Sequence, residues 1–255
     1  NDKIILPDDS LGYTRSNIRH WNNDPIAKQQ LKRASIVGMS YNDSHSYGDR
    51  AFTKHDRRVL DMKHLSGKDR RELAHFAIRT INSARNAMNL PSWTYSSNAE
   101  RFAMNTAKYY TQDGAGNDDD DHDVHAILKA AKQNGLRTDL GQVYEDESGF
   151  EVLPNARYQT MWHAKLMLRL NIEQMLFGNW TPRKLQSDIY YHDLKDPKRY
   201  IEWDHTKDLL DAHNHYDNPN KEIGVAFSVR GNDEVSVHIL TVPQEYIVHP
   251  SKYYR

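Results

Sequence analysis

The stretch IGVAFSVRGNDEVSVHI, residues 223–239, decides the fold of this chain. Apolar residues alternate with small or polar ones on both sides of Gly231-Asn232, a pair that is typical of tight turns. Strict alternation places every second side chain on the same face of a strand. The pattern therefore predicts a β-hairpin. The side chains that we expect to be buried in it are Val225, Phe227, Val237 and Ile239. Removal of the aromatic ring by Phe227→Ala should lower the free energy of unfolding by about 3 to 5 kcal/mol.

Upstream of the hairpin, the apolar residues recur at the spacing of helices. A capping-box pattern at Ser66 opens a long helix with an apolar face, and a second box at Ser97 opens a helix that ends at Gly114. Further helices are expected at about 27–37, 124–134, 158–177 and 206–211. Helices that come first and a hairpin that comes last predict an α+β domain, in which helices cover an antiparallel sheet.

Composition limits the classes of protein to consider. The chain has 255 residues, a net charge of −1 and no cysteine, with 27% charged and 38% hydrophobic residues. The near-neutral charge and the lack of a basic run argue against a nucleic-acid-binding surface. Disulfides, thiolate metal sites and a cysteine nucleophile are excluded. No apolar run is long enough to cross a membrane. A chain that begins at Asn1 without methionine reads as a soluble fragment, with any signal peptide or anchor outside it.

The stretch DDDDHDVHAILKAAKQNGL, residues 118–136, holds most of the candidate chemistry. Five acids and two histidines fall within eight residues, directly before an alanine-rich helix. Acids at a helix entrance are favoured by the helix dipole. Imidazoles beside carboxylates suit a metal site or an acid/base pair. A run of four aspartates is also typical of a solvated, mobile loop, so both interpretations stay open at this point.

Six segments, in this order, resemble a known family. They read ELAHFAIRTINSARNAMNLPSW, FAMNTAKYY, HDVHAILKAAKQNGL, MLRLNIEQMLFGNW, WDHTKDLL and IGVAFSV…SVHILTV. The family is the CAP-like domain of Gram-positive surface exclusion proteins of the PrgA/PgrA type, within the cysteine-rich secretory, antigen-five and pathogenesis-related superfamily. The resemblance implies an α-β-α sandwich with a small antiparallel sheet. We expect the CAP-like domain at residues 65–255 and an N-terminal extension packed on it at residues 1–64.

The resemblance also implies a cleft lined by two histidines and two acids, which binds a divalent cation in some members. The first histidine falls at His122, with His125 as its close competitor, and the second at His205. One acid falls at Glu173. The other should follow Gly141, where this chain has Gln142 instead, and Glu145 is the candidate replacement. The metal ligands expected by this resemblance are His122, Glu145, Glu173 and His205.

Chemistry leaves two roles open for these residues. Two imidazoles and a carboxylate can hold Zn²⁺ with a water in the open position, and weak Zn²⁺ binding is the expected cofactor. Without metal, the same groups could serve as a general base and its orienter. Glu173 lies in an otherwise apolar helix, so it could instead accept hydrogen bonds from His205, because a buried carboxylate must be paired. Structural pairing and ligand binding stay open for Glu173.

Two functions follow from the resemblance. The first is an extracellular, wall-attached surface exclusion or adhesion module, which binds a cell-wall component, a surface protein of another cell or a small apolar ligand without turnover. The resemblance links this function to conjugation. The second is a metal-assisted peptidase that uses His122, Glu173 and His205. The sequence contains neither a G-x-S-x-G serine motif nor an H-E-x-x-H zinc motif, so we favour the binding module.

Overall fold

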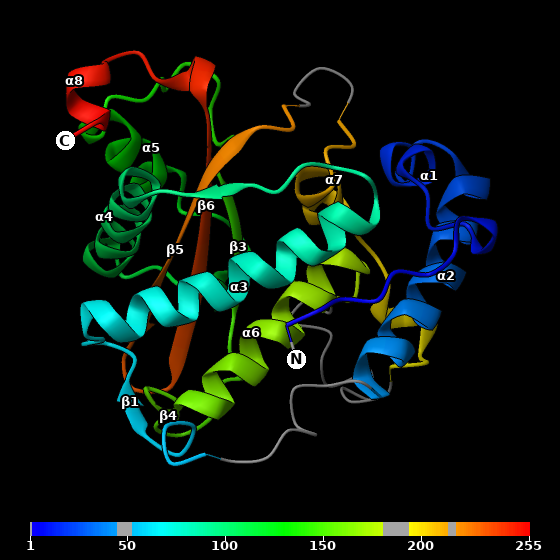
Figure 1. The fold of residues 1–255 in the computed structure, drawn as a ribbon, viewed down its shortest axis with the longest axis horizontal. Coiled ribbons are helices and arrows are strands. Elements are labelled where there is room, and N and C mark those ends of the chain that lie inside the picture. Colours follow the sequence, from blue (N-terminus) through cyan, green and yellow to red (C-terminus); the bar gives the residue numbers. More distant parts are fainter. Residues whose placement is uncertain (1, 45–52, 181–193, 214–217) are drawn as a thin grey trace. The chain divides into compact units, whose positions relative to one another are not determined.

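The computed structural model describes residues 2–44, 53–180, 194–213 and 218–255 (Figure 1). Its chain forms two compact units, each built from three separate segments. The first unit consists of Asn1–Arg50, Arg79–Ser92 and Arg169–Pro219. The second consists of Ala51–Ile78, Trp93–Leu168 and Asn220–Arg255. The boundary expected between residues 64 and 65 stays a prediction.

The second unit contains a four-stranded sheet in the order β2-β5-β6-β3. Its strands are β2 (Thr94–Tyr95), β3 (Glu145–Gly149), β5 (Lys221–Arg230) and β6 (Glu234–Pro243). The predicted hairpin is confirmed as β5 and β6, which pair antiparallel with Val225 opposite Ile239. Gly231 has a φ of +62° in the turn, a conformation that glycine adopts without strain. The short edge strand β2 runs parallel to β5, so the sheet is mixed.

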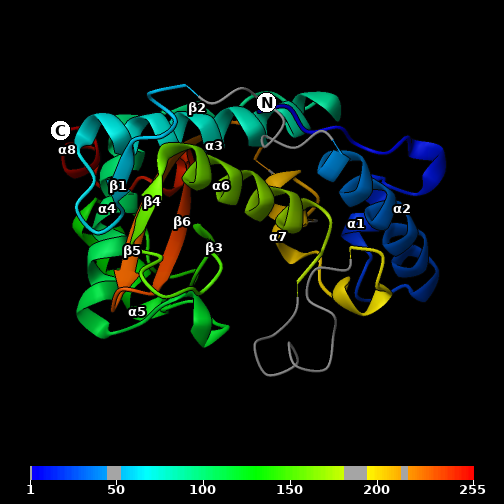
Figure 2. The ribbon, with the colours of Figure 1, turned by 90° about the horizontal axis from the view of Figure 1, so that it is seen from below.

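Helices cover both faces of this sheet. On one face lie α4 (Ser97–Asp113) and α5 (Val124–Gln133), as Figures 1 and 2 show. The approach of α4 is close, because a Cβ at Gly224 would lie 2.4 Å from the backbone of Ala99. The opposite face is covered by residues 67–78 of α3 (Gly67–Ala87) and residues 161–168 of α6 (Met161–Leu176). This arrangement confirms the predicted α+β class with a sheet between helical layers.

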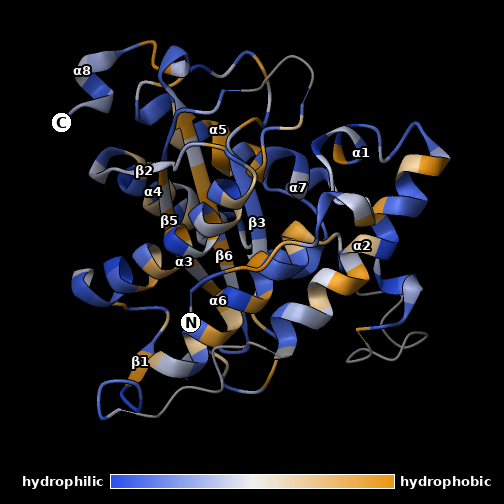
Figure 3. Ribbon diagram, turned by 45° about the vertical axis from the view of Figure 1, so that its right-hand side comes forward, coloured by the Kyte–Doolittle hydropathy of each residue, from blue (hydrophilic) through white to orange (hydrophobic). Residues whose placement is uncertain are grey.

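The hairpin strands carry much of the core. Figure 3 shows hydrophobic segments along β5 and β6, and Val225, Val237 and Ile239 are 0 to 1% exposed, as predicted. The prediction for Phe227 is wrong, because its side chain is only half-buried. Its ring lies 6.4 Å from the ring of Phe150. Alternation in a sequence fixes the face on which a side chain lies, whereas the extent to which a large ring is covered depends on tertiary neighbours.

Partial exposure lowers the expected effect of a mutation at this site. Phe227→Ala should decrease the free energy of unfolding by about 1 to 3 kcal/mol, since part of the ring already contacts water. Phe102→Ala, at a ring that is 0% exposed on α4, should cost about 3 to 5 kcal/mol. Urea denaturation of both variants measures the two losses. Equal losses would show that Phe227 is as well covered as Phe102.

A small second sheet also belongs to this unit. It pairs β1 (Val59–Asp61) antiparallel with β4 (Tyr158–Thr160). Residues 158–160 are therefore strand, and the helix expected at 158–177 begins at Met161. A 3₁₀ helix at Asn117–Asp119 (η3), another at Gln244–Tyr246 (η6) and α8 (Pro250–Tyr253) complete the unit.

The first unit is largely helical. Its elements are η1 (Asp9–Leu11), α1 (Arg15–Arg19), α2 (Pro25–Ser44), η5 (Pro197–Arg199) and α7 (Asp204–Leu209), with the carboxyl-terminal parts of α3 and α6. Arg85 of α3 is 0% exposed and forms a 2.7 Å ion pair with Asp211. Helix α2 is longer than the helix expected at 27–37. Among the described residues, no helix has both the length and the apolar character needed to span a membrane.

Candidate functional site

The acidic stretch before α5 is anchored on the hairpin. The backbone N–H of Asn117 donates to Ser236 Oγ at 2.9 Å, and that of Asp118 donates to Glu234 Oε1 at 2.8 Å. Arg230 of β5 forms an ion pair with Asp119 at 3.0 Å. The backbone at residues 117 and 118 is thus held on the hairpin, whereas Asp119, Asp120 and Asp121 of the acidic run are exposed. These long-range contacts hold the chain against β6 just before His122.

Helix capping places His122 beside β3. Asp123 is the N-cap of α5, and its Oδ1 accepts the N–H of Ala126 at 3.0 Å. The backbone N–H of Asp123 itself donates to the hydroxyl of Tyr110 at 2.8 Å. The preceding residue, His122, then lies with Nδ1 2.7 Å from Glu145 Oε1. Of the two competing histidines, His122 is the one that contacts the candidate acid.

Glu145 is the centre of a buried polar network. Its Oε1 accepts hydrogen bonds from His122 and, at 2.6 Å, from the hydroxyl of Tyr110. Its Oε2 lies 2.7 Å from Nδ1 of His238 on β6. Burial alone would raise the pKa of Glu145, but the bonds from His122 and His238 outweigh it and lower the pKa to about 2. Glu145 is therefore an ionised carboxylate at neutral pH, held by three donors.

The network continues from His238 to Ser228. Nε2 of His238 lies 2.7 Å from the Ser228 hydroxyl, so serine, histidine and glutamate are connected as in a nucleophilic triad. However, His238 is 0% exposed and Ser228 is 7% exposed, on the sheet face that α4 covers. A covered hydroxyl cannot meet a substrate, so this chain of hydrogen bonds fixes the tautomer of His238 and the position of Glu145.

Glu147 is a second buried acid on the same face of β3. It is 8% exposed, and its Oε2 has no hydrogen-bond partner among the described residues. Burial, with a further contribution from the charge of Glu145, raises the pKa of Glu147 to about 10. His122, Glu145 and Glu147 each offer one ligand atom, and these atoms lie within 4.8 Å of one another. The three residues could together hold a metal ion.

Gln142 has a structural role at the start of β3. Its Oε1 accepts the N–H groups of Tyr144 and Glu145 at 2.7 and 2.8 Å, and its Nε2 donates to the Glu145 carbonyl at 2.9 Å. An amide can do both, whereas a carboxylate could not donate. The side chain that departs from the family pattern thus supports the turn. The acid beside His122 is supplied three residues later by Glu145.

Glu173 and His205 belong to the first unit, whereas His122 and Glu145 belong to the second. The ion-pair partner of Glu173 is Arg169, one turn earlier on α6, at 2.9 Å. Burial raises the pKa of Glu173 to about 7, although the charge of Arg169 opposes this shift. Thr206, next to His205, donates to the carbonyl of Met175 at 2.7 Å, so α7 packs at the end of α6. Convergence of all four residues stays a prediction.

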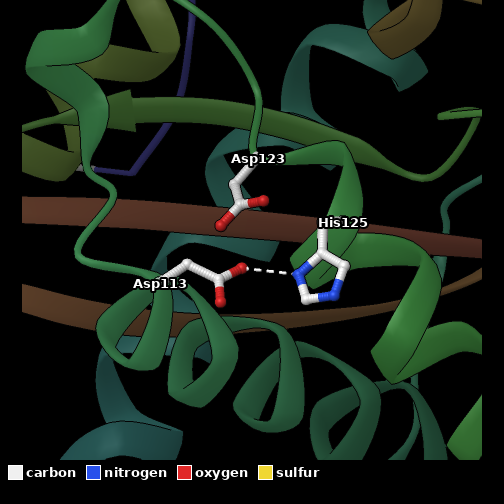
Figure 4. Close-up of side chains that lie close together, drawn as sticks. All are labelled: Asp113, Asp123 and His125. Atoms are coloured by element: carbon white, nitrogen blue, oxygen red, sulfur yellow. Dashed lines mark hydrogen bonds and ion pairs between the residues drawn. The ribbon is translucent and has the colours of Figure 1, made fainter.

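A second cluster surrounds the competing histidine. His125 Nδ1 lies 2.8 Å from Asp113 Oδ2, and Asp123 lies beside them, as Figure 4 shows. Both His125 and Asp113 are exposed, and the pKa of Asp113 is lowered first by its hydrogen bond to His125. Asp123 already caps α5 through Oδ1. This cluster links the last residue of α4 to the first turn of α5.

Comparisons with known proteins identify the fold of the chain. No family model and no curated protein matches the sequence. Among solved structures, the chain is similar to the CAP domain of enterococcal PrgA, with a TM-score of 0.67 and 21% sequence identity. The match covers 97% of this chain and 88% of that one, and so includes most of residues 1–64. The chain therefore has the CAP fold that the order of its sequence motifs predicted.

Proposed function

We propose that this chain is the binding module of an extracellular surface protein of the exclusion or adhesion type. It contacts a cell-wall component, a surface protein of another cell or a small apolar ligand, without turnover. In the full-length protein it is attached to the cell surface. The observation that supports this proposal most is the CAP fold shared with the PrgA domain over 97% of the chain.

The geometry around Glu145 favours binding over turnover. The side chain of His122 is 29% exposed, whereas those of Glu145 and His238 are 0% exposed. His122 is therefore the member of this network that solvent can reach. The Ser228 hydroxyl, which is hydrogen-bonded to His238, is 7% exposed and therefore covered. An ionised carboxylate that three donors already satisfy is stable without a substrate, as a recognition scaffold requires.

A metal-assisted peptidase is the second candidate. The short contact between His122 and Glu145 favours it, because an imidazole oriented by a carboxylate can act as a metal ligand or a general base. On this hypothesis the two imidazoles and the carboxylate that the resemblance names, His122, His205 and Glu173, would hold Zn²⁺, which would activate a water. The ion pair of Glu173 with Arg169 weakens that role, because a neighbouring guanidinium disfavours a cation at the same carboxylate.

Two measurements test the proposal. Recipient cells that display the chain should receive a conjugative plasmid less often, or adhere to partner cells more strongly, than cells that display an unrelated domain of similar size. In parallel, the purified chain should cleave no member of a broad peptide library, with or without Zn²⁺. Cleavage that is lost in both His122→Ala and His205→Ala would establish the peptidase instead.

A further inference from the structure

The outer face of α4, α5 and α8 carries lysines and arginines without acids. Residues 101–112, 124–138 and 246–255, which include most of these helices, hold seven Lys or Arg residues and no Asp or Glu. The whole chain, by contrast, has 34 basic and 35 acidic residues. A surface that only keeps a protein in solution mixes charges of both signs. One of the seven cations, Arg137, forms an ion pair with Asp139. The other six define what we call the basic face: Arg101, Lys108, Lys129, Lys132, Lys252 and Arg255.

Tyr109 holds the central lysines of the basic face together. Lys108 of α4 and Lys129 of α5 both lie over its ring, with Nζ 5.9 and 4.4 Å from the ring centroid. The Tyr109 hydroxyl donates to Gln133, which fixes the ring against α5. Lys132 comes three residues after Lys129 and therefore lies beside it on the same side of that helix. Three ammonium groups thus share one part of the surface, and all three lysines are exposed.

The carboxyl-terminal segment extends the basic face. Nη2 of Arg101 on α4 donates to the carbonyl of Tyr253 at 2.6 Å, and Nη2 of Arg255 donates to the carbonyl of Gln133 at 3.2 Å. Figures 1 and 2 both place α8 beside α4 and α5. These contacts bring Arg255 and the exposed Lys252 next to the lysines of α4 and α5. All six cations belong to the second unit.

The cations of the basic face have no carboxylate to neutralise them. None of the six forms an ion pair with an acid in the part of the chain that the structure describes. Arginines elsewhere in the same unit are paired, as Arg58 is with Asp69 at 2.6 Å. Two acids border the face, but Asp113 is hydrogen-bonded to His125, and Glu222 of β5 is half-buried. Clustered cations without acids produce a positive potential that attracts anions.

A surface of this kind suits a polymer that repeats its charge. One exposed ion pair contributes little to binding. Several cations that contact one chain at the same time bind it far more tightly, because every contact after the first is intramolecular. Four of the six cations are lysines, whose ammonium groups bind phosphate as point charges and require no fixed geometry. The partner that fits is therefore linear, flexible and anionic.

The aromatic residues of this surface are poorly placed to stack on bases. The side chain of Tyr109 is 9% exposed and its ring is covered by two ammonium groups, while Tyr253 is 0% exposed. Tyr254 is 50% exposed, with its ring packed edge-on against Tyr253. Proteins that bind single-stranded nucleic acids stack successive bases on several exposed rings. The basic face therefore fits the phosphates of a polymer better than it fits bases.

We propose that the basic face binds a linear phosphodiester polymer without bases, of the poly(glycerol phosphate) class. The inference rests on the proposed function and deepens it, because it names the chemical class of the cell-wall component that the module contacts. It involves neither His122 nor Glu145, and it needs no metal. Its cations come from three separate segments of the chain, so no basic run in the sequence marks this surface.

The experiment measures binding of the full chain to immobilised poly(glycerol phosphate) by biolayer interferometry at neutral pH. We expect the wild type to bind, with an affinity that falls about tenfold or more when NaCl is raised from about 50 to about 300 mM. Lys108→Gln, Lys129→Gln and Lys132→Gln combined should weaken binding about tenfold or more and make its salt dependence shallower, because fewer phosphates are neutralised. Arginine at the same three positions should preserve binding, because the charge is kept.

Exposed lysines elsewhere in the same unit supply a matched control. Lys54→Gln, Lys63→Gln and Lys68→Gln combined remove the same number of charges outside the basic face and should change the affinity less than about twofold. Lys132→Glu combined with Lys252→Glu leaves both cation–π contacts in place, so it tests the face even where the triple glutamine variant fails to fold. It should lower the affinity about tenfold or more. Circular dichroism checks the fold of each variant.

Three results would overturn the inference. Equal losses in the triple glutamine variant and its control would mean that total charge decides, not this face. A single-stranded oligonucleotide that binds more tightly than poly(glycerol phosphate), and loses binding in the same variant, would make the face a nucleic-acid surface. A wild-type chain that supports exclusion or adhesion but binds no poly(glycerol phosphate) refutes the inference and leaves the proposed function standing. Polymer binding by a chain that changes neither plasmid transfer nor adhesion would reject the proposed function alone.

Discussion

Replacing Glu145 by glutamine should lower the free energy of unfolding by about 2 to 4 kcal/mol at neutral pH. The side chain of Glu145 is 0% exposed and accepts hydrogen bonds from His122, Tyr110 and His238. An amide offers one acceptor oxygen, and its NH₂ group would face a donor. At least one buried donor then loses its acceptor, which costs about 1 to 3 kcal/mol by itself. The charge that favours N–H donation from both imidazoles is lost as well.

The pH dependence of this loss has a definite sign. The pKa of Glu145 is lowered from its ordinary value of 4.5 to about 2 in the folded chain. Between these values the unfolded chain binds more protons than the folded one, so stability increases with pH. The contribution of Glu145 is therefore complete above about pH 4.5 and is lost as the pH falls toward 2. Glu145→Gln should remove this dependence from the wild-type profile.

Urea denaturation between pH 3 and 7 measures the effect. Glu151 is exposed, so Glu151→Gln is a matched control that makes the same chemical change, and it should alter stability by less than about 0.5 kcal/mol. A Glu145→Gln variant as stable as the Glu151→Gln control would show that the three hydrogen bonds do not contribute to stability. It would also remove Glu145 as the centre of the network.

Local sequence patterns were sufficient to predict the main layers. The alternation around Gly231 predicted β5 and β6, and the capping patterns at Ser66 and Ser97 predicted the starts of α3 and α4. These signals succeed because each depends on residues that are close in sequence. The sheet of β1 and β4 depends on pairing between Leu60 and Gln159, which lie 99 positions apart. No short-range signal marks such a pairing, so residues 158–160 were expected to be helical.

The candidate site was predictable only in part. The resemblance to CAP-like domains directed attention to His122, and the missing acid at Gln142 pointed to Glu145, which the structure places beside it. His238 was missed because the alternation of β6 was interpreted for one face only. Its neighbours Val237 and Ile239 define one face, whereas His238 lies on the other, beneath Tyr110 at a ring distance of 4.3 Å. A histidine inside a strand covered on both faces was the available signal.

Glu147 could not be found from its sequence context. The segment EDESG of β3 reads as a polar loop, since acids and glycine are depleted in strands. It becomes a buried strand only because β6 pairs with it along its whole length. Tertiary structure thus overrides local propensity at the position where the buried acid is least completely bonded. Conflicts of this kind are expected at functional sites, where a protein gives up stability.

Glu147→Gln should therefore have the opposite effect to Glu145→Gln, two residues earlier. At neutral pH, we expect it to increase the free energy of unfolding by about 1 to 3 kcal/mol. The pKa of Glu147 is raised from 4.5 to about 10, because burial and the charge of Glu145 both oppose ionisation. At pH 7 the unfolded chain ionises this group freely, whereas the folded chain must keep its proton. Glutamine does not ionise, so it carries no such difference in protonation between the folded and the unfolded chain.

The same argument fixes the pH profile. Between about pH 4.5 and 10 the folded chain binds more protons at Glu147 than the unfolded chain, so wild-type stability falls as the pH rises. The advantage of Glu147→Gln should be absent near pH 4 and should grow toward pH 9, while Glu151→Gln follows the wild type. A variant that is less stable than the wild type at pH 7 would show that Glu147 is ionised and paired in the folded chain.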